Sequence, residues 1–165
     1  MFAVRARGLT ALATALALAL GLSACAHNDQ PAAGAGYAAA GPGSVQEFNQ
    51  TVGDRVFFDT DQTDLTPTAQ ATLDKQATWL NRYSHYSFTI EGHADERGTR
   101  EYNFALGARR AQTVHDYLVA KGVSASRMKT ISYGKERPVA VCDDISCWSQ
   151  NRRAVTVLNG APGSS

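Results

Sequence analysis

Residues 86–121 read YSFTIEGHADERGTREYNFALGARRAQTVHDYLVAK. The first five alternate apolar with polar side chains, which is the period of a half-buried strand. From Tyr102 to Lys121 the apolar residues instead recur every three or four positions, which predicts a long helix. The stretch therefore predicts a strand, a polar loop and a helix in succession.

One face of this predicted helix carries a charge. Leu106, Val114 and Leu118 recur at multiples of four. Arg110 falls in the same row, so its side chain is expected to point toward the packed face, whereas Arg109 lies about 100° away around the helix. A guanidinium beside a core costs several kcal/mol unless it is paired. Arg110 therefore needs a carboxylate, either from the protein or from a ligand.

The loop before the helix holds the nearest acidic residues. Residues 91–98, EGHADERG, leave a strand and lead into a helix, and ligand sites often form at such loops. Asp95 and Arg110 are therefore candidates for one polar site, with a purely structural ion pair as the alternative. A zwitterionic ligand suits both side chains, because arginine binds a carboxylate through two parallel hydrogen bonds and aspartate binds an ammonium group.

Segments on either side complete the predicted fold. In chain order the expected elements are a short helix capped by Ser44 (Ser44–Thr51), a strand (Arg55–Phe58), a helix from Thr66-Pro67 to about Tyr83, the strand at 86–90, the helix Tyr102–Lys121, and strands at Thr130–Tyr133 and Arg153–Leu158. This order predicts an α+β protein in which two main helices pack on one face of a small mixed four-stranded sheet.

The first 24 residues have the pattern of a secretory signal peptide. Arg5 and Arg7 precede the uncharged stretch Leu9–Leu22, which is shorter than the ~20 apolar residues that a membrane helix needs. A short N-terminal membrane anchor is the alternative interpretation.

The end of that stretch, LSAC at 22–25, resembles the lipobox of bacterial lipoproteins. The resemblance implies cleavage before Cys25 and lipidation of its thiol. Ala26 follows, rather than the Asp that resembles an inner-membrane retention signal, so an anchor on the periplasmic face of the outer membrane is expected. Gly, Ala and Pro dominate the next residues, so 25–43 are predicted to be a lipidated, flexible tether, 44–160 one domain and 161–165 a tail.

Composition excludes one broad class of function. The chain has 165 residues and a formal net charge of +1, part of which belongs to the arginines of the signal peptide. There is no basic surplus of the kind that a nucleic-acid-binding protein carries. Its three cysteines are an odd number, so one of them has no partner within the chain.

Several separated motifs resemble one family in the same order. They are EGHADERGT (91–99), EYN (101–103), LGARRA (106–111), SYGKE (132–136) and NRRAV (151–155). From about Phe57 to Leu158 the chain is similar to the OmpA-like peptidoglycan-binding domain, and these forms of the motifs are similar to its branch of peptidoglycan-associated lipoproteins. The resemblance implies an OmpA-like β-α-β-α-β-β sandwich.

The resemblance also implies a ligand, the diaminopimelate of the peptidoglycan stem peptide, bound without covalent chemistry. By this likeness Asp95 takes the ammonium group and Arg110 the side-chain carboxylate. Asp61 is similar to a further contact residue, and Arg97 and Asn103 are expected to line or shape the loop.

Partners follow from the resemblance alone. It implies TolB, which competes for the same surface, and TolA through the Tol–Pal complex, which draws the outer membrane inward at cell division. Another OmpA-like envelope lipoprotein outside this system is the alternative.

An enzyme is the rival class. His93, Asp95 and Glu96 share one loop, but a zinc site usually needs three protein ligands and an open position, and neither an H-E-x-x-H nor a G-x-S-x-G motif is present. No catalysis, no cofactor and no metal is therefore expected.

One region departs from the family pattern. Cys142 and Cys147 follow the Gly-Lys-Glu-Arg-Pro turn, and in an oxidising compartment they are expected to form a disulfide, with two free thiols as the alternative. Asn151 and Arg152 resemble family positions, but a strand-end cap and a solvated charge explain them equally well.

Overall fold

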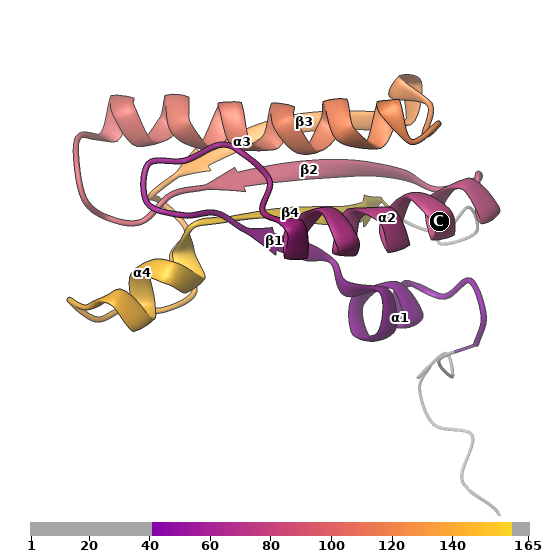
Figure 1. Ribbon diagram of the computed structural model, residues 1–165, viewed down its shortest axis with the longest axis horizontal. Coiled ribbons are helices and arrows are strands. Elements are labelled where there is room, and N and C mark those ends of the chain that lie inside the picture. The colour runs from indigo at the N-terminus through magenta and orange to yellow at the C-terminus, as the bar shows by residue number, and fades with distance from the viewer. Residues whose placement is uncertain (1–40, 160–165) are drawn as a thin grey trace, which may run out of the picture. The chain divides into compact units, whose positions relative to one another are not determined.

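The computed structural model describes residues 41–159, and the predicted signal peptide, Cys25, the tether up to residue 40 and the tail lie outside this range. The elements in chain order are α1 (Val45–Glu47), a π-helical turn η1 (Phe48–Gly53), β1 (Arg55–Phe57), α2 (Pro67–Arg82), β2 (Ser87–His93), α3 (Arg100–Ala120), a 3₁₀ turn η2 (Ala125–Arg127), β3 (Met128–Gly134), α4 (Ile145–Asn151) and β4 (Arg153–Asn159). The predicted α+β architecture is confirmed, with α2 and α3 on one face of the sheet (Figure 1).

The sheet is mixed and has the order β1-β4-β2-β3. The central strand β2 pairs parallel with β3 and antiparallel with β4, which in turn pairs antiparallel with β1. Two parallel neighbours need a crossover connection, and α3 provides it between β2 and β3. The loops at the carboxyl end of β2 therefore meet the start of α3 at one end of the molecule, on the left in Figure 1.

The core lies between the helices and the sheet. Along β2 the side chains alternate as predicted, with Phe88 and Ile90 fully buried. The predicted apolar row of α3 is buried as well, and Arg110 is buried with it. The other large apolar side chains of the core include Phe48, Leu73, Trp79, Leu80 and Tyr86.

Two glycines let α3 approach the backbone of β2. A Cβ atom on Gly92 would overlap the carbonyl oxygen of Gly107, and one on Gly107 would lie 2.5 Å from the Oγ atom of Ser132. Because the backbones touch here, the side chain three residues further along α3, Arg110, lies over the end of β2. This close approach is what places a helical guanidinium beside the loop that follows the strand.

A hydroxyl side chain caps the start of each of the first three α-helices. The predicted caps Ser44 and Thr66 accept the main-chain N–H groups of Glu47 (3.1 Å) and Ala69 (3.2 Å). The first helix, however, continues as the π-helical turn η1 rather than as an α-helix. Helix α3 begins at Arg100, two residues before the predicted start, because Thr99 is its cap.

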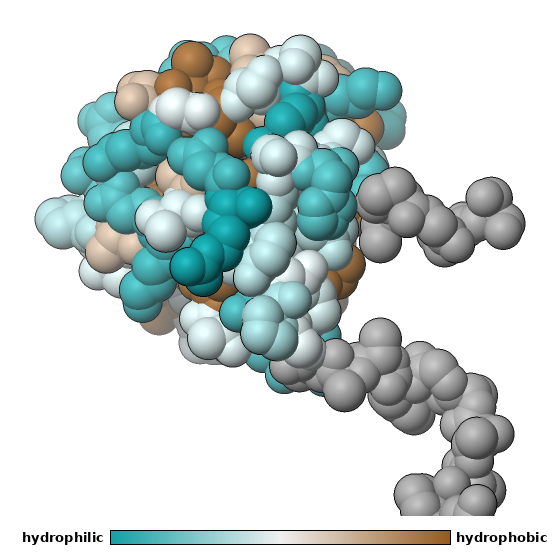
Figure 2. Space-filling view, turned by 90° about the vertical axis from the view of Figure 1, so that its right-hand side faces the viewer, coloured by the Kyte–Doolittle hydropathy of each residue, from teal (hydrophilic) through white to brown (hydrophobic). Residues whose placement is uncertain are grey.

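The chain enters the domain at the end opposite the 94–99 loop. The hydroxyl of Tyr86, just before β2, donates to the carbonyl oxygen of Gly43 over 2.9 Å, whereas the loop follows the far end of the same strand. Figure 2 shows this entry end of the molecule, where hydrophilic side chains cover most of the surface. No helix within residues 41–159 combines the length and apolarity needed to cross a membrane.

Candidate functional site

Asp95 is the centre of the polar site at the end of β2. Its side chain is buried, and two arginines bind it. From Arg97, Nη2 lies 2.6 Å from Oδ2 and Nε 3.2 Å from Oδ1, and the main-chain N–H also donates to Oδ1. Nη1 of Arg152 donates to Oδ2 over 3.3 Å. The alternative interpretation, a structural ion pair between Asp95 and Arg110, does not hold, because Arg97 and Arg152 bind the carboxylate instead.

The charge of Asp95 is stabilised by these bonds. Burial by itself would raise the pKa of the carboxyl group, but the hydrogen bonds from Arg97 and Arg152 outweigh burial and hold the pKa below the usual aspartate value. The two arginines differ in access, since 40% of the Arg97 side chain is exposed and only 7% of the Arg152 side chain. Arg97 is therefore the partner that a ligand from solvent can replace.

Arg110 is completely buried, and main-chain oxygen atoms surround its guanidinium. Nε donates to the carbonyl of Gln62 (2.9 Å), Nη1 to that of His93 (2.8 Å) and Nη2 to that of Asp59 (3.1 Å). Within residues 41–159, therefore, three carbonyl dipoles compensate the charge of Arg110, and no carboxylate is hydrogen-bonded to it. Burial, and next the charge of Arg152, lower the pKa of Arg110 to about 10, so it remains a cation at neutral pH.

The bonds from Arg110 hold the 59–62 loop in place, and this loop presents Asp61. Asp61 has φ of 56°, a left-handed conformation that aspartate tolerates better than most residues. Its Oδ1 accepts a hydrogen bond from the Tyr102 hydroxyl over 3.2 Å. Its negative charge acts to raise the pKa of both Arg97 and Arg110. Asp61, Asp95, Arg97 and Arg110 therefore lie close enough for the charges of the two aspartates to act on the pKa values of both arginines.

The 94–99 loop is held from α3 and from the segment after β3. The Asn103 side chain is buried, and its Nδ2 donates to the carbonyl of Arg97 over 2.7 Å. Nζ of Lys135 donates to the carbonyls of Glu96 (3.1 Å) and Gly98 (2.7 Å). Asn103 therefore holds the shape of the loop through the carbonyl of Arg97.

Two residues left open by the sequence have clear structural roles. Arg152 is not a solvated charge, since it is 6% exposed and donates to the carbonyl of Phe58 (3.0 Å) as well as to Asp95. Asn151 is buried, and its Oδ1 accepts the main-chain N–H groups of Val139 and Ala140. These contacts join residues far apart in sequence, so spacing alone did not indicate them.

Helix α4 was not among the elements predicted from the sequence. The structure joins Cys142 and Cys147 in a disulfide, with the Cα atoms 5.7 Å apart, and begins α4 within the closed segment. Asp144 caps the helix, with Oδ1 accepting the main-chain N–H of Ser146 over 2.7 Å. An Asp before an apolar residue was the available signal, and it was overlooked.

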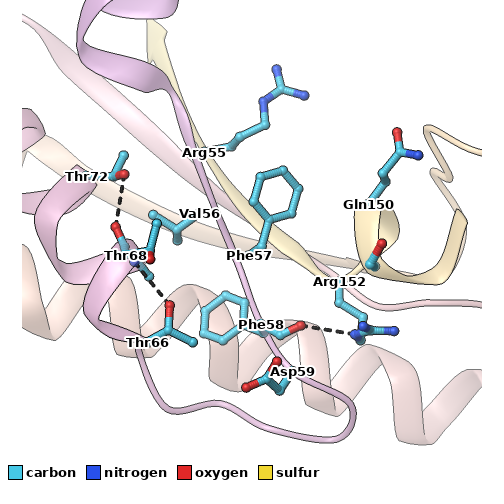
Figure 3. A pocket seen from close by; sticks show the side chains of 12 residues that line it. Arg55, Val56, Phe57, Phe58, Asp59, Thr66, Thr68, Thr72, Gln150 and Arg152 are labelled. Carbon is cyan, nitrogen blue, oxygen red and sulfur yellow. Dashed lines mark hydrogen bonds between the residues drawn. The ribbon is translucent and has the colours of Figure 1, made fainter. Parts of the chain in front are cut away.

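A groove of about 530 Å³ follows the outer edge of β1, between the start of α2 and α4 (Figure 3). It does not include the 94–99 loop. Asp59 and Arg152 line it and also belong to the contacts described above, and Figure 3 shows Arg152 bonded to the carbonyl of Phe58. The groove is therefore a neighbour of the polar site and not the site itself.

His93 lies at the end of β2 with no hydrogen-bond partner on either ring nitrogen, and it is 2% exposed. The nearest carboxylate oxygen, from Glu91, is 3.6 Å from Nε2, too far for a hydrogen bond. Burial first, and then the charges of Arg153, Arg137 and Arg55, lower the pKa of His93 to about 4. Within residues 41–159 no three His, Cys, Asp or Glu side chains are grouped to hold a metal ion.

Burial of neutral His93 predicts a pH dependence of stability. The unfolded chain takes up a proton near pH 6.5 and the folded one only near pH 4, so the stabilisation is complete above pH 6.5 and is lost as the pH falls to about 4. Urea unfolding of the wild type and of His93→Gln at pH 7.5 and 4.5 should show an extra loss of about 2–3 kcal/mol in the wild type. Parallel pH profiles of the two proteins would contradict the burial of an uncharged imidazole.

Comparison with known proteins identifies the class to which this fold and site belong. Residues 57–152 match the model of the OmpA family. A peptidoglycan-associated lipoprotein of Rhizobium meliloti (strain 1021) is 65% identical over 152 residues, which are 89% of this chain and 86% of the relative. The chain therefore belongs to the OmpA family and, within it, to the peptidoglycan-associated lipoproteins.

Solved structures agree with this assignment. The crystal structure of the peptidoglycan-associated lipoprotein from Burkholderia pseudomallei is 39% identical, with a TM-score of 0.65, and the match covers 67% of this chain and 96% of that one. The C-terminal domain of Helicobacter pylori MotB, at 19% identity and a TM-score of 0.61 over 66% of this chain and 86% of that one, shares the fold alone. The relatives carry the name of a lipoprotein rather than of an enzyme, which agrees with the expectation that the chain is not an enzyme.

Proposed function

We propose that this protein is a lipoprotein that binds peptidoglycan non-covalently, through the diaminopimelate of the stem peptide, and so tethers the outer membrane to the cell wall. The observation that carries the proposal is the Asp95 carboxylate, which is kept charged and has one partner, Arg97, open to solvent. An ammonium group of the ligand can take the place of Arg97 at Asp95. Family membership supports peptidoglycan as the source of that group, since relatives carry it in their names.

The carboxylate end of diaminopimelate needs a cation at the same site. Arg110 uses three of its five N–H groups on carbonyl oxygens, which leaves two for a ligand carboxylate. Arg110 is fully buried and two of its bonds go to the 59–62 loop, so a ligand carboxylate can reach the guanidinium only if this loop moves. Asp61, at the tip of the loop and already bonded to Tyr102, is then placed to contact the ligand as well.

The position of the site in the domain suits a tether between two layers. The chain enters beside Tyr86 at one end of β2, and the 94–99 loop lies at the other end of this seven-residue strand, ~20 Å away. With residues 1–24 as a cleaved signal, Cys25 as the lipid anchor and residues up to 43 as the tether, the site lies at the end of the domain opposite the point where the tether joins it. TolB, and through it TolA, are the partners proposed for the same surface in the Tol–Pal system.

Titration of the purified protein with a diaminopimelate-containing muropeptide tests the proposal. The control ligand is the same muropeptide with the side-chain carboxylate of diaminopimelate amidated, which removes one charge and leaves its size nearly unchanged. We expect the amidated form to bind at least about tenfold more weakly, and binding of the natural form to weaken as salt rises. Equal affinities measured by calorimetry for the two ligands would exclude recognition of diaminopimelate by ion pairing.

A further inference from the structure

Helix α4 contacts the 94–99 loop through one aromatic side chain, that of Trp148. Its indole Nε1 donates a hydrogen bond to Oε1 of Glu96. The guanidinium carbon of Arg97 lies over the same ring, 4.2 Å from the ring centroid, in a cation–π contact. Trp148 thus holds two consecutive residues of the loop, and the second of them is the residue that binds Asp95.

The position of Trp148 depends on the disulfide. Trp148 directly follows Cys147, whose side chain is buried, and the bond to Cys142 fixes this turn of α4 to the segment that leaves β3. At the other end of α4 the side chain of Asn151 binds the same segment through Val139 and Ala140. Helix α4 is therefore fixed at both ends, and Trp148 projects from it onto the loop.

We infer that Cys142, Cys147 and Trp148 form a brace that positions Arg97 and Asp95 for the ligand, so that affinity for the stem peptide depends on the oxidation state of the cysteine pair. The inference rests on the proposed function for its ligand. The contacts of Trp148 with Glu96 and Arg97 do not use the Asp95 carboxylate, so they remain when a ligand ammonium displaces the Arg97 guanidinium from Asp95. They then limit the rotamer freedom of the displaced side chain and keep the loop that carries Asp95 in place. A loop that is already ordered loses less conformational entropy when the ligand binds, so it binds the ligand more tightly without any additional contact.

Reduction releases the brace by a defined step. A dithiol breaks the S–S bond, two electrons and two protons convert Cys142 and Cys147 to thiols, and the dithiol is oxidised to its own disulfide. Trp148 then remains on α4, but the first turn of that helix is no longer tied to the segment after β3.

Muropeptide affinity of the oxidised and the dithiothreitol-reduced protein tests the brace. Ordering one long side chain on binding costs about 0.5–1.5 kcal/mol, so affinity should fall about three- to tenfold on reduction. The double variant Cys142→Ser/Cys147→Ser should bind like the reduced protein and should not respond to dithiothreitol.

Trp148→Leu should weaken binding to a similar extent, and Trp148→Phe less, since it keeps a ring for Arg97 but has no N–H for Glu96. Ile145→Ala, an exposed change on the same helix, is the matched control and should have no effect.

Two measurements without ligand separate this inference from the proposed function. Reduction, or Trp148→Leu, should speed hydrogen exchange of the Arg97 amide, which donates to Asp95, and should move the pKa of Asp95 up toward its usual value by NMR. A wild type that binds no muropeptide in either oxidation state would exclude the proposed function, and these two measurements would still decide on the brace. The brace is overturned if reduction lowers the melting temperature but leaves the exchange rate, the Asp95 pKa and the affinity unchanged.

Discussion

An Arg110→Leu variant is expected to lose about 3–5 kcal/mol of unfolding free energy, a large part of the 5–15 kcal/mol typical of a domain. The side chain is fully buried, and its removal leaves the carbonyl oxygens of Asp59, Gln62 and His93 without their donor. Leucine has nearly the helix propensity of arginine, so the loss reflects these contacts and not a weaker α3. Urea unfolding followed by circular dichroism measures it.

The neighbouring residue provides the control for this prediction. Arg109 lies on the same helix but is exposed, so Arg109→Leu should change stability by no more than about 0.5 kcal/mol. Arg110→Lys should fall between the two, because one ammonium group cannot reach three diverging carbonyls. Equal unfolding midpoints for Arg109→Leu and Arg110→Leu would show that the carbonyl cluster contributes nothing to the fold.

The error in predicting the partners of Arg110 has a physical reason. Helical periodicity correctly placed the guanidinium on the buried face of α3, and a buried cation does need compensation. A pattern of charged residues, however, shows only side chains. The groups that compensate Arg110 are main-chain carbonyls, those of Asp59 and Gln62 in the loop after β1 and that of His93 at the end of β2. Where a carbonyl points is fixed by the path of the folded chain, and residue types do not reveal it.

Local signals predicted the elements better than they predicted the site. The caps Ser44 and Thr66 and the alternation along β2 follow from neighbouring residues, and the structure agrees with them. Arg152, in contrast, binds Phe58 and Asp95, which lie 94 and 57 residues away along the chain. No periodicity links such positions, so the ion pairs of Asp95 with Arg97 and Arg152 were not predicted.

Asp95→Asn is expected to weaken muropeptide binding roughly 100-fold. The amide keeps the shape of the side chain but removes the negative charge that is proposed to hold the ammonium group, and a hydrogen bond to a charged group contributes about 1.5–3 kcal/mol. It also leaves the buried Arg152 without a carboxylate, so a loss of stability should accompany the loss of affinity. Calorimetric titration and urea unfolding of the same preparation measure both.

The pH dependence of binding, together with a control variant, distinguishes a role of Asp95 in ligand contact from a purely structural ion pair. Because Arg97 and Arg152 hold the pKa of Asp95 below its usual value, the carboxylate stays charged in the folded state to a pH at which an ordinary aspartate is protonated. Its contribution to stability is therefore present above the ordinary aspartate pKa and is lost only as the pH falls through the lowered one. Wild-type binding should persist to the same low pH, whereas Asp64→Asn, an exposed carboxylate outside the Asp95 ion pairs, should leave both affinity and profile unchanged. If Asp95→Asn lowers stability but binds the muropeptide as tightly as Asp64→Asn does, then Asp95 pairs only with the arginines of its own chain, and the ammonium contact must be sought at Asp61.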